Sequence, residues 1–236
     1  NFDQFGGSGG AVNDPLRKDL TERLAASVYK QAEAKRAAGD GVGAVDAFLR
    51  VAAVAPDSTI RATAEYDAAA QLINLKLWDR AIGVLENYRR SYPKDARQAD
   101  VTRNLAVAYS EAGRAGDAAA EFERIAQSPT EEPAVQREAL QSAADLYDRA
   151  GNAAKARGML ELFVQKYPQP LAPAIEARQR LVDFANKAGD AEGQLAWYRE
   201  IVKADAGGGA QRTDRSRFLA ARAQLEGLPG GGLNIA

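Results

Sequence analysis

The stretch LAVAYSEAGRAGDAAAEF, residues 105–122, decides the fold. It starts with a large and a small apolar residue, and the aromatic Tyr109 follows one helical turn later. Gly113 then supplies the positive-φ conformation that commonly ends a helix. Beyond it, Ala118 leaves room for a second helix to approach, and Phe122 fills the space one turn on. The stretch therefore predicts a helical hairpin with a defined packing face.

The same order of residue types recurs along the chain, and the corner residue of each hairpin measures the repeat. The corners are Gly39, Lys76, Gly113, Gly151 and Gly189, which are spaced by 37, 37, 38 and 38 residues. A fixed period in this range is typical of a solenoid, in which each unit buries its apolar face by stacking on its neighbours. Because Lys76 replaces glycine, we expect a different local turn at that corner.

The period sets the expected organisation of the chain. A linker covers residues 1–13, a solenoid covers 14–206, and its repeats lie at about 25–58, 62–95, 99–132, 137–170 and 175–208. A glycine-rich joint and one more helix are expected at 207–226, with a corner at Gly227 and a flexible tail at 227–236. That helix is either a cap on the last apolar face or the first half of a sixth repeat.

Composition excludes several classes of function. The chain has 236 residues, with Lys+Arg 31, Asp+Glu 32, no Cys and no His. Thiolate chemistry, imidazole bases and histidine-ligated metals are therefore excluded for this chain acting alone, and no positive excess suggests nucleic acid. No apolar run is long enough for a membrane span. Since the chain starts at Asn1 with no basic or apolar leader, we expect it to be a processed or excised piece of a longer protein.

No motif in the chain requires catalysis, a cofactor or a small-molecule substrate. The glycine-rich segment 39–43 precedes a predicted helix, but it follows no strand and lacks the Gly-Lys-Ser/Thr of a phosphate-binding loop. It is interpreted as a plain turn. We therefore expect a chain that is not an enzyme and that binds no metal.

The order small residue, aromatic, glycine, alanine, aromatic, proline resembles the tetratricopeptide repeat, over about residues 25–206. The resemblance implies an all-α, right-handed α-α superhelical solenoid of about five hairpins plus a C-terminal helix. The longer period, with Tyr92-Pro93 and Tyr167-Pro168, resembles bacterial cell-envelope members such as the Tol-Pal accessory protein and the lipoprotein of the outer-membrane β-barrel assembly machine. It implies a periplasmic or envelope location, with a cytoplasmic adaptor as the alternative.

In this family the first helix of each hairpin lines a concave groove, which binds a protein or peptide segment. Counting by turns, the predicted groove residues are Tyr29, Arg36, Tyr66, Ile73, Asn74, Arg103, Val107, Asp145, Asp148 and Asp183. The N-terminal set is typical of an amphipathic peptide site, and the acidic set favours a partner bearing Lys or Arg. The alternative is that the tyrosines pack between helices and the aspartates form a solvated face.

Two functions follow from this interpretation. The first is a non-enzymatic protein–protein interaction scaffold of the bacterial envelope. The second is a helper domain of a larger envelope enzyme or polysaccharide-export machine, whose chemistry lies in other parts of that protein.

Overall fold

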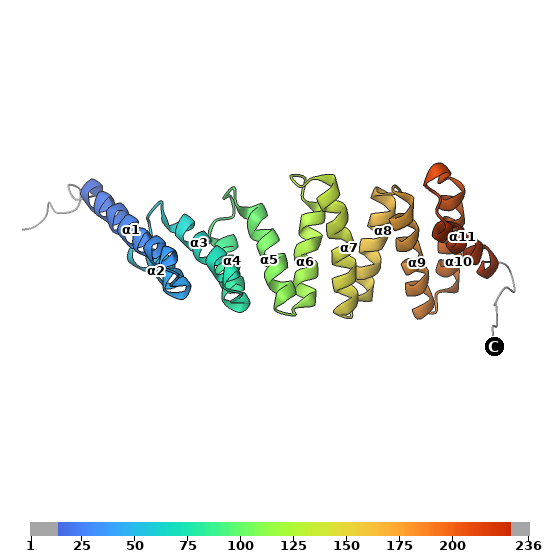
Figure 1. Ribbon diagram of the computed structural model, residues 1–236, viewed down its shortest axis with the longest axis horizontal. Coiled ribbons are helices and arrows are strands. Elements are labelled where there is room, and N and C mark those ends of the chain that lie inside the picture. Colours follow the sequence, from blue (N-terminus) through green and yellow to red (C-terminus); the bar gives the residue numbers. More distant parts are fainter. Residues whose placement is uncertain (1–13, 228–236) are drawn as a thin grey trace, which may run out of the picture. The chain divides into compact units, whose positions relative to one another are not determined.

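The computed structural model describes residues 14–227, which form helices joined by short turns and contain no strand (Figure 1). The helices are α1 (Asp14–Ala37), α2 (Gly41–Val54), α3 (Arg61–Asn74), α4 (Trp78–Ser91), α5 (Gln98–Glu111), α6 (Ala115–Gln127), α7 (Pro133–Arg149), α8 (Ala153–Lys166), α9 (Leu171–Lys187), α10 (Ala191–Ala206), the short 3₁₀ helix η1 (Gly209–Gln211) and α11 (Asp214–Glu226). The predicted all-α fold is confirmed. The linker 1–13 and the tail beyond Gly227 lie outside the described residues.

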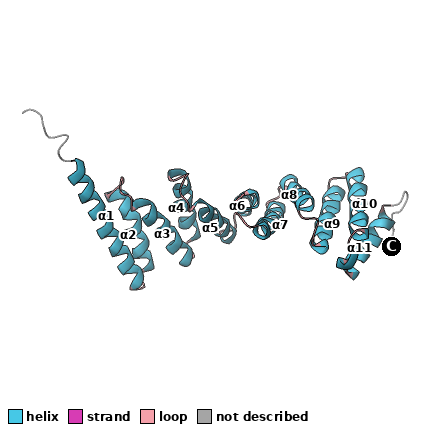
Figure 2. Cartoon of the chain, turned by 90° about the horizontal axis from the view of Figure 1, so that it is seen from above, coloured by secondary structure: helices cyan, strands magenta, loops and turns pink. Residues whose placement is uncertain are grey.

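The helices form two compact units, an N-terminal unit that ends at Gly113 and a C-terminal unit that begins at Arg114. The N-terminal unit contains α1 to α5, and the C-terminal unit contains α6 to α11. Within each unit every α-helix packs against the next one in the chain (Figures 1 and 2). The stretch 105–122 therefore contributes one helix to each unit.

Each unit has a core made of the residues that the repeat pattern selects. In the N-terminal unit Phe48, Leu72 and Leu85 are completely buried. In the C-terminal unit Phe163 and Leu181 are completely buried as well. Small residues at the crossing points, mostly alanines, let the helices approach closely enough to bury these side chains. Phe122, by contrast, is only half-buried.

The corners between paired helices share one turn, and Lys76 adopts it too. The φ angles of Gly39, Gly151 and Gly189 are 82°, 75° and 69°, and that of Lys76 is 57°. After Lys76, the Leu77 N–H donates to the Leu72 carbonyl at 2.9 Å. This bond between residues five positions apart is typical of helices that end in a left-handed glycine. The expected departure at this corner is therefore wrong. The hydrogen-bond pattern imposes the left-handed conformation even though the residue carries a side chain.

Replacing Lys76 with glycine is expected to raise the free energy of unfolding by up to about 1 kcal/mol. The left-handed conformation costs a residue with a Cβ atom about 1–2 kcal/mol, and the extra freedom of glycine in the unfolded chain offsets part of that gain. Urea denaturation measures the change. Gly151→Ala is the matched control, because Gly151 is the equivalent corner residue of a hairpin in the C-terminal unit. This substitution should lower the free energy of unfolding. A destabilised Lys76→Gly chain would contradict the argument.

The tyrosine near the end of a first helix has a repeated structural role. The Tyr109 hydroxyl of α5 donates to Glu86 of α4, and the Tyr147 hydroxyl of α7 donates to Glu123 of α6. Lys155 of α8 completes the second group, with Nζ 3.1 Å from Glu123 and 3.0 Å from the Tyr147 hydroxyl. Because the two tyrosine–glutamate bonds lie one repeat apart, each joins a first helix to the second helix of the preceding hairpin in the same way.

The C-terminal end of the array differs from the expectation. Gly208 is buried, and a Cβ atom there would lie 2.3 Å from Leu171, so the glycine-rich joint is a packed turn at this residue. Gly227 has φ −83° and forms the C-cap of α11, so the predicted left-handed corner at this residue is wrong. Helix α11 buries Leu219 and Ala223 against α9 and α10, and thereby covers their apolar face.

Candidate partner-binding site

Tyr29 of α1, a predicted groove residue, is half-buried and tied to its own chain. Its hydroxyl donates to Asp67 of α3, and its ring meets Phe48 edge-on with 5.1 Å between the centroids. Burial, together with the Asp67 carboxylate, raises the pKa of Tyr29 to about 12. The side chain therefore joins two successive first helices, which is the packing alternative considered above.

Tyr66 of α3 lies in a cluster of aromatic and charged side chains. Its ring is 5.8 Å from that of Tyr88, and the Arg97 guanidinium lies 5.4 Å from the Tyr66 centroid and 5.5 Å from the Tyr88 centroid. Arg97 is held in turn by Asp95, to which its guanidinium donates two hydrogen bonds at 2.9 Å. This arrangement lowers the pKa of Asp95 well below its usual range, chiefly through the hydrogen bonds from Arg97. Sequence reasoning missed Arg97, although a cation two residues after Asp95 was a visible signal.

The other predicted residues of the N-terminal unit range from half-buried to exposed. Ile73 packs against the core, and Asn74 is exposed at the end of α3. Arg36 is exposed and lies over the Phe48 ring at 5.5 Å. Arg103 forms an ion pair with Asp100 one turn away on α5. Val107 has 47% of its surface exposed in the middle of α5.

In the C-terminal unit the predicted acidic residues are exposed but partly compensated. Asp145 of α7 pairs with Arg180 of α9 at 2.6 Å, so the aspartate joins two first helices. Asp183 accepts a hydrogen bond from Gln179 at 3.2 Å. Asp148 is exposed, and its carboxylate has no ion pair or hydrogen bond with other described residues. The acidic character of this face is therefore weaker than the sequence suggests.

The structure also exposes apolar side chains that were not predicted. Leu16, Leu20 and Leu24 form a strip on the first turns of α1, ahead of the first expected repeat. On α11, Phe218 is 65% exposed and Leu225 is 52% exposed. The spacing of the three leucines was a visible helical signal, but the repeat register gave them no role.

The described residues hold no group of three or more His, Cys, Asp or Glu side chains that could bind a metal ion. Among residues 14–227, each helix is too short or too polar to cross a membrane.

One segment of the chain matches a known family model. Residues 138–170, which run along α7 from Glu138 and through α8, match the model described as tetratricopeptide repeat. The match lies within the fourth expected repeat and shows a tetratricopeptide repeat over these residues. No curated protein sequence matches the chain.

Several solved structures are similar at low identity. MamA is 19% identical over 79% of this chain and 92% of its own, with a TM-score of 0.43. A tetratricopeptide repeat protein from Parabacteroides merdae is 13% identical over 86% of this chain and 77% of its own, with a TM-score of 0.46. PilF of Pseudomonas aeruginosa is 16% identical over 92% of this chain and 95% of its own, with a TM-score of 0.38. With TM-scores below 0.5, these likenesses carry no argument about partners or activity.

Proposed function

We propose that the chain is a non-enzymatic scaffold that binds a segment of another protein on the first helices α1, α3 and α5 of its N-terminal unit. The observation that carries the proposal is Val107, an apolar side chain left 47% exposed on α5, on the same helix as the exposed Arg103. Arginine is enriched at protein-binding interfaces, and an exposed apolar side chain on the same helix adds surface that a partner can bury. Arg36 and Asn74 add exposed polar groups on α1 and α3.

The location belongs to the same proposal. The resemblance of the long repeat with Tyr92-Pro93 and Tyr167-Pro168 to bacterial envelope members supports a periplasmic or envelope-associated scaffold. Both tyrosines also have a packing role, because Tyr92 contacts Tyr88 and Tyr167 contacts Phe163 one turn earlier. Fractionation of the native organism with an antibody to this chain tests the location. Recovery of the chain only with cytoplasmic markers would reject it.

The exposed aspartates of the C-terminal unit, Asp145, Asp148 and Asp183, support a second part of the proposal. This unit is proposed to prefer partner segments that carry Lys or Arg. Asp148 is the best probe, because Asp145 is engaged by Arg180 and Asp183 by Gln179. Such a contact weakens as salt is added, because dissolved ions screen exposed charges over a length of about 10 Å at 0.1 M ionic strength.

A photo-crosslinking amino acid at position 107 is expected to capture a partner, while the same amino acid at Asn87 is not. Val107 is exposed on the first helix α5, and Asn87 is exposed on the second helix α4 of the same unit. Mass spectrometry identifies the captured protein, and a binding assay with that protein purified then compares Val107→Glu with the unchanged chain. We expect at least tenfold weaker binding, about 1.4 kcal/mol, because a carboxylate replaces the apolar contact.

Tyr66→Ala is a poorer test than Val107→Glu. The Tyr66 ring packs on Tyr88 and under Arg97, so its loss would also weaken the fold. Equal affinity of the Val107→Glu chain for the purified partner, with an unchanged circular dichroism spectrum, would remove this face from the proposal.

A further inference from the structure

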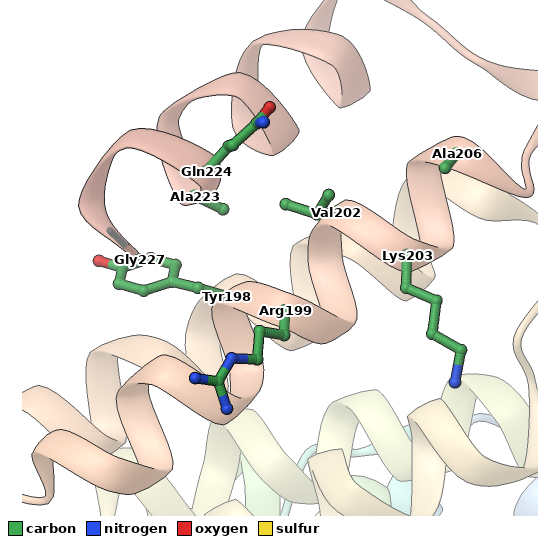
Figure 3. Close-up of a pocket in the computed structure, with 8 residues that line it drawn as sticks. All are labelled: Tyr198, Arg199, Val202, Lys203, Ala206, Ala223, Gln224 and Gly227. Carbon is green, nitrogen blue, oxygen red and sulfur yellow. The ribbon is translucent and has the colours of Figure 1, made fainter. Parts of the chain in front are cut away.

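A furrow of about 340 Å³ lies between α10 and α11, wholly within the C-terminal unit (Figure 3). Its walls come from one side of α10 and one edge of α11. The lining residues are Tyr198, Arg199, Val202, Lys203, Ala206, Ala223, Gln224 and Gly227. None of the predicted groove residues is among them, so the furrow is a separate surface.

The floor of the furrow is apolar. Figure 3 shows Val202 of α10 and Ala223 of α11 facing each other across it, with the Tyr198 ring at the end near Gly227. The Tyr198 hydroxyl donates to Glu226, so its polar atom already has a partner and the ring is left as an apolar wall. Burial, with the Glu226 hydrogen bond, raises the pKa of Tyr198 and keeps it neutral. The floor therefore suits an apolar side chain.

The side of the furrow formed by α10 is positively charged. Arg199 and Lys203 are one turn apart and project from α10 on the side away from α11 (Figure 3). Arg199 is exposed and has no ion pair with the described residues. The Lys203 Nζ is 3.8 Å from Glu200, and both side chains are well exposed, so this pair contributes little. No lining residue carries a carboxylate.

The furrow is open on one side, and this openness distinguishes between a small molecule and a peptide segment as its ligand. Arg199, Lys203, Ala206 and Gln224 are all exposed. Sites for small molecules enclose about 70–90% of the ligand surface, which an open furrow does not do. A peptide segment needs only to insert one or two side chains while its backbone stays on the surface. The openness therefore favours a peptide.

We propose that this furrow binds a segment of a partner protein in which one or two large apolar side chains are flanked by Asp or Glu. The apolar side chains occupy the floor at Val202 and Ala223, and the carboxylates pair with Arg199 and Lys203. The inference rests on the proposed scaffold function and adds a second surface to it. Its charge preference is opposite to that of the aspartates on α7 and α9.

Fluorescence anisotropy with the full chain tests the proposal, using three labelled peptides of one length. The first peptide has the central sequence Glu-Glu-Leu-Phe-Glu-Glu, the second replaces each Glu with Lys, and the third replaces Leu-Phe with Gly-Gly. We expect only the first to bind, with an affinity that falls as salt is added. Arg199→Glu and Lys203→Glu are each expected to weaken binding at least tenfold, and Ala206→Trp, which fills the furrow, is expected to abolish it.

Arg90→Glu is the matched control, because Arg90 is exposed on α4 of the other unit and is not a lining residue of the furrow. It should leave binding unchanged. Equal binding of all three peptides, no binding of the acidic peptide at about 1 mM, or indifference to Arg199→Glu in a folded chain would overturn the proposal. Much tighter binding by a chain that ends at Gly227 would assign the furrow to residues 228–236 and overturn it too.

The outcome is separable from that of the proposed function. The crosslink at position 107 lies in the N-terminal unit, whereas Arg199 and Lys203 lie in the C-terminal unit. A crosslink that persists while the acidic peptide fails to bind would reject the furrow alone. Loss of the crosslink with intact peptide binding would reject the α1, α3 and α5 face and leave the furrow as a binding surface.

Discussion

Phe48→Ala is expected to lower the free energy of unfolding of the N-terminal unit by about 3–5 kcal/mol, the usual cost of removing a fully buried aromatic ring. Phe48 is completely buried on α2, where its ring meets Tyr29 edge-on and the Arg36 guanidinium lies 5.5 Å away. The substitution leaves a cavity among alanines and other rigid neighbours, which cannot collapse to fill it.

The measurement is urea denaturation followed by tryptophan fluorescence. The chain has two tryptophans, Trp78 in the N-terminal unit and Trp197 in the C-terminal unit, so Trp197→Phe leaves a reporter for the unit that contains Phe48. Phe218→Ala is the control with the same chemical change, because Phe218 is 65% exposed; it is measured in a chain with Trp78→Phe, in which Trp197 reports on the C-terminal unit, and we expect a loss below about 0.5 kcal/mol. Similar losses of unfolding free energy for the two variants would contradict the burial of Phe48 on α2.

Arg97→Ala is expected to cost about 2–3 kcal/mol at pH 7, since it removes a charge-assisted pair and two cation–π contacts. The Arg97 and Asp95 side chains are 29% and 21% exposed, so solvent screens the pair only in part. Arg97→Lys should recover little of the loss, because an ammonium group cannot form two parallel hydrogen bonds to Asp95. Arg90→Ala, at an exposed arginine, is the control.

The cost of Arg97→Ala is also expected to depend on pH. Arg97 holds the pKa of Asp95 well below its usual range, so the pair stabilises the folded chain above about pH 4 and loses that contribution as the pH falls toward the folded pKa. The difference between the unchanged chain and the variant should shrink by about 1 kcal/mol between pH 7 and pH 3. A difference that stays constant over this range would show that Asp95 is not the partner that matters.

The helices and corners followed from the sequence because both depend on local chemistry. Apolar periodicity sets which face of a helix is buried, and Gly39, Gly151 and Gly189 provide positive φ at the expected places. The error at Lys76 arose because residue preference was given more weight than hydrogen bonding. The bond from Leu77 to Leu72 satisfies a carbonyl at the helix end, and that gain holds the lysine in a conformation it would otherwise avoid.

The surfaces were less predictable because a side chain's role depends on neighbours from other repeats. Counting by turns placed Tyr29 and Asp145 on a groove, but it could not show that Asp67 and Arg180 would engage them. The furrow at Val202 and Ala223 depends on how α11 lies on α10, and the repeat offers no template for that contact. Sequence periodicity therefore predicts the buried residues better than it predicts which exposed residues are available to bind a partner.

The corner glycines have a practical consequence for protein engineering. A Cβ atom built on Gly39, Gly151 or Gly189 would have no neighbour within 4 Å, so these turns project into open space. Foreign peptides such as epitope tags or fluorescent labels are tolerated best at exposed loop tips of this kind. The turn at Gly39 in the N-terminal unit and the turns at Gly151 and Gly189 in the C-terminal unit are thus permissive sites at which new segments can be displayed without touching either core.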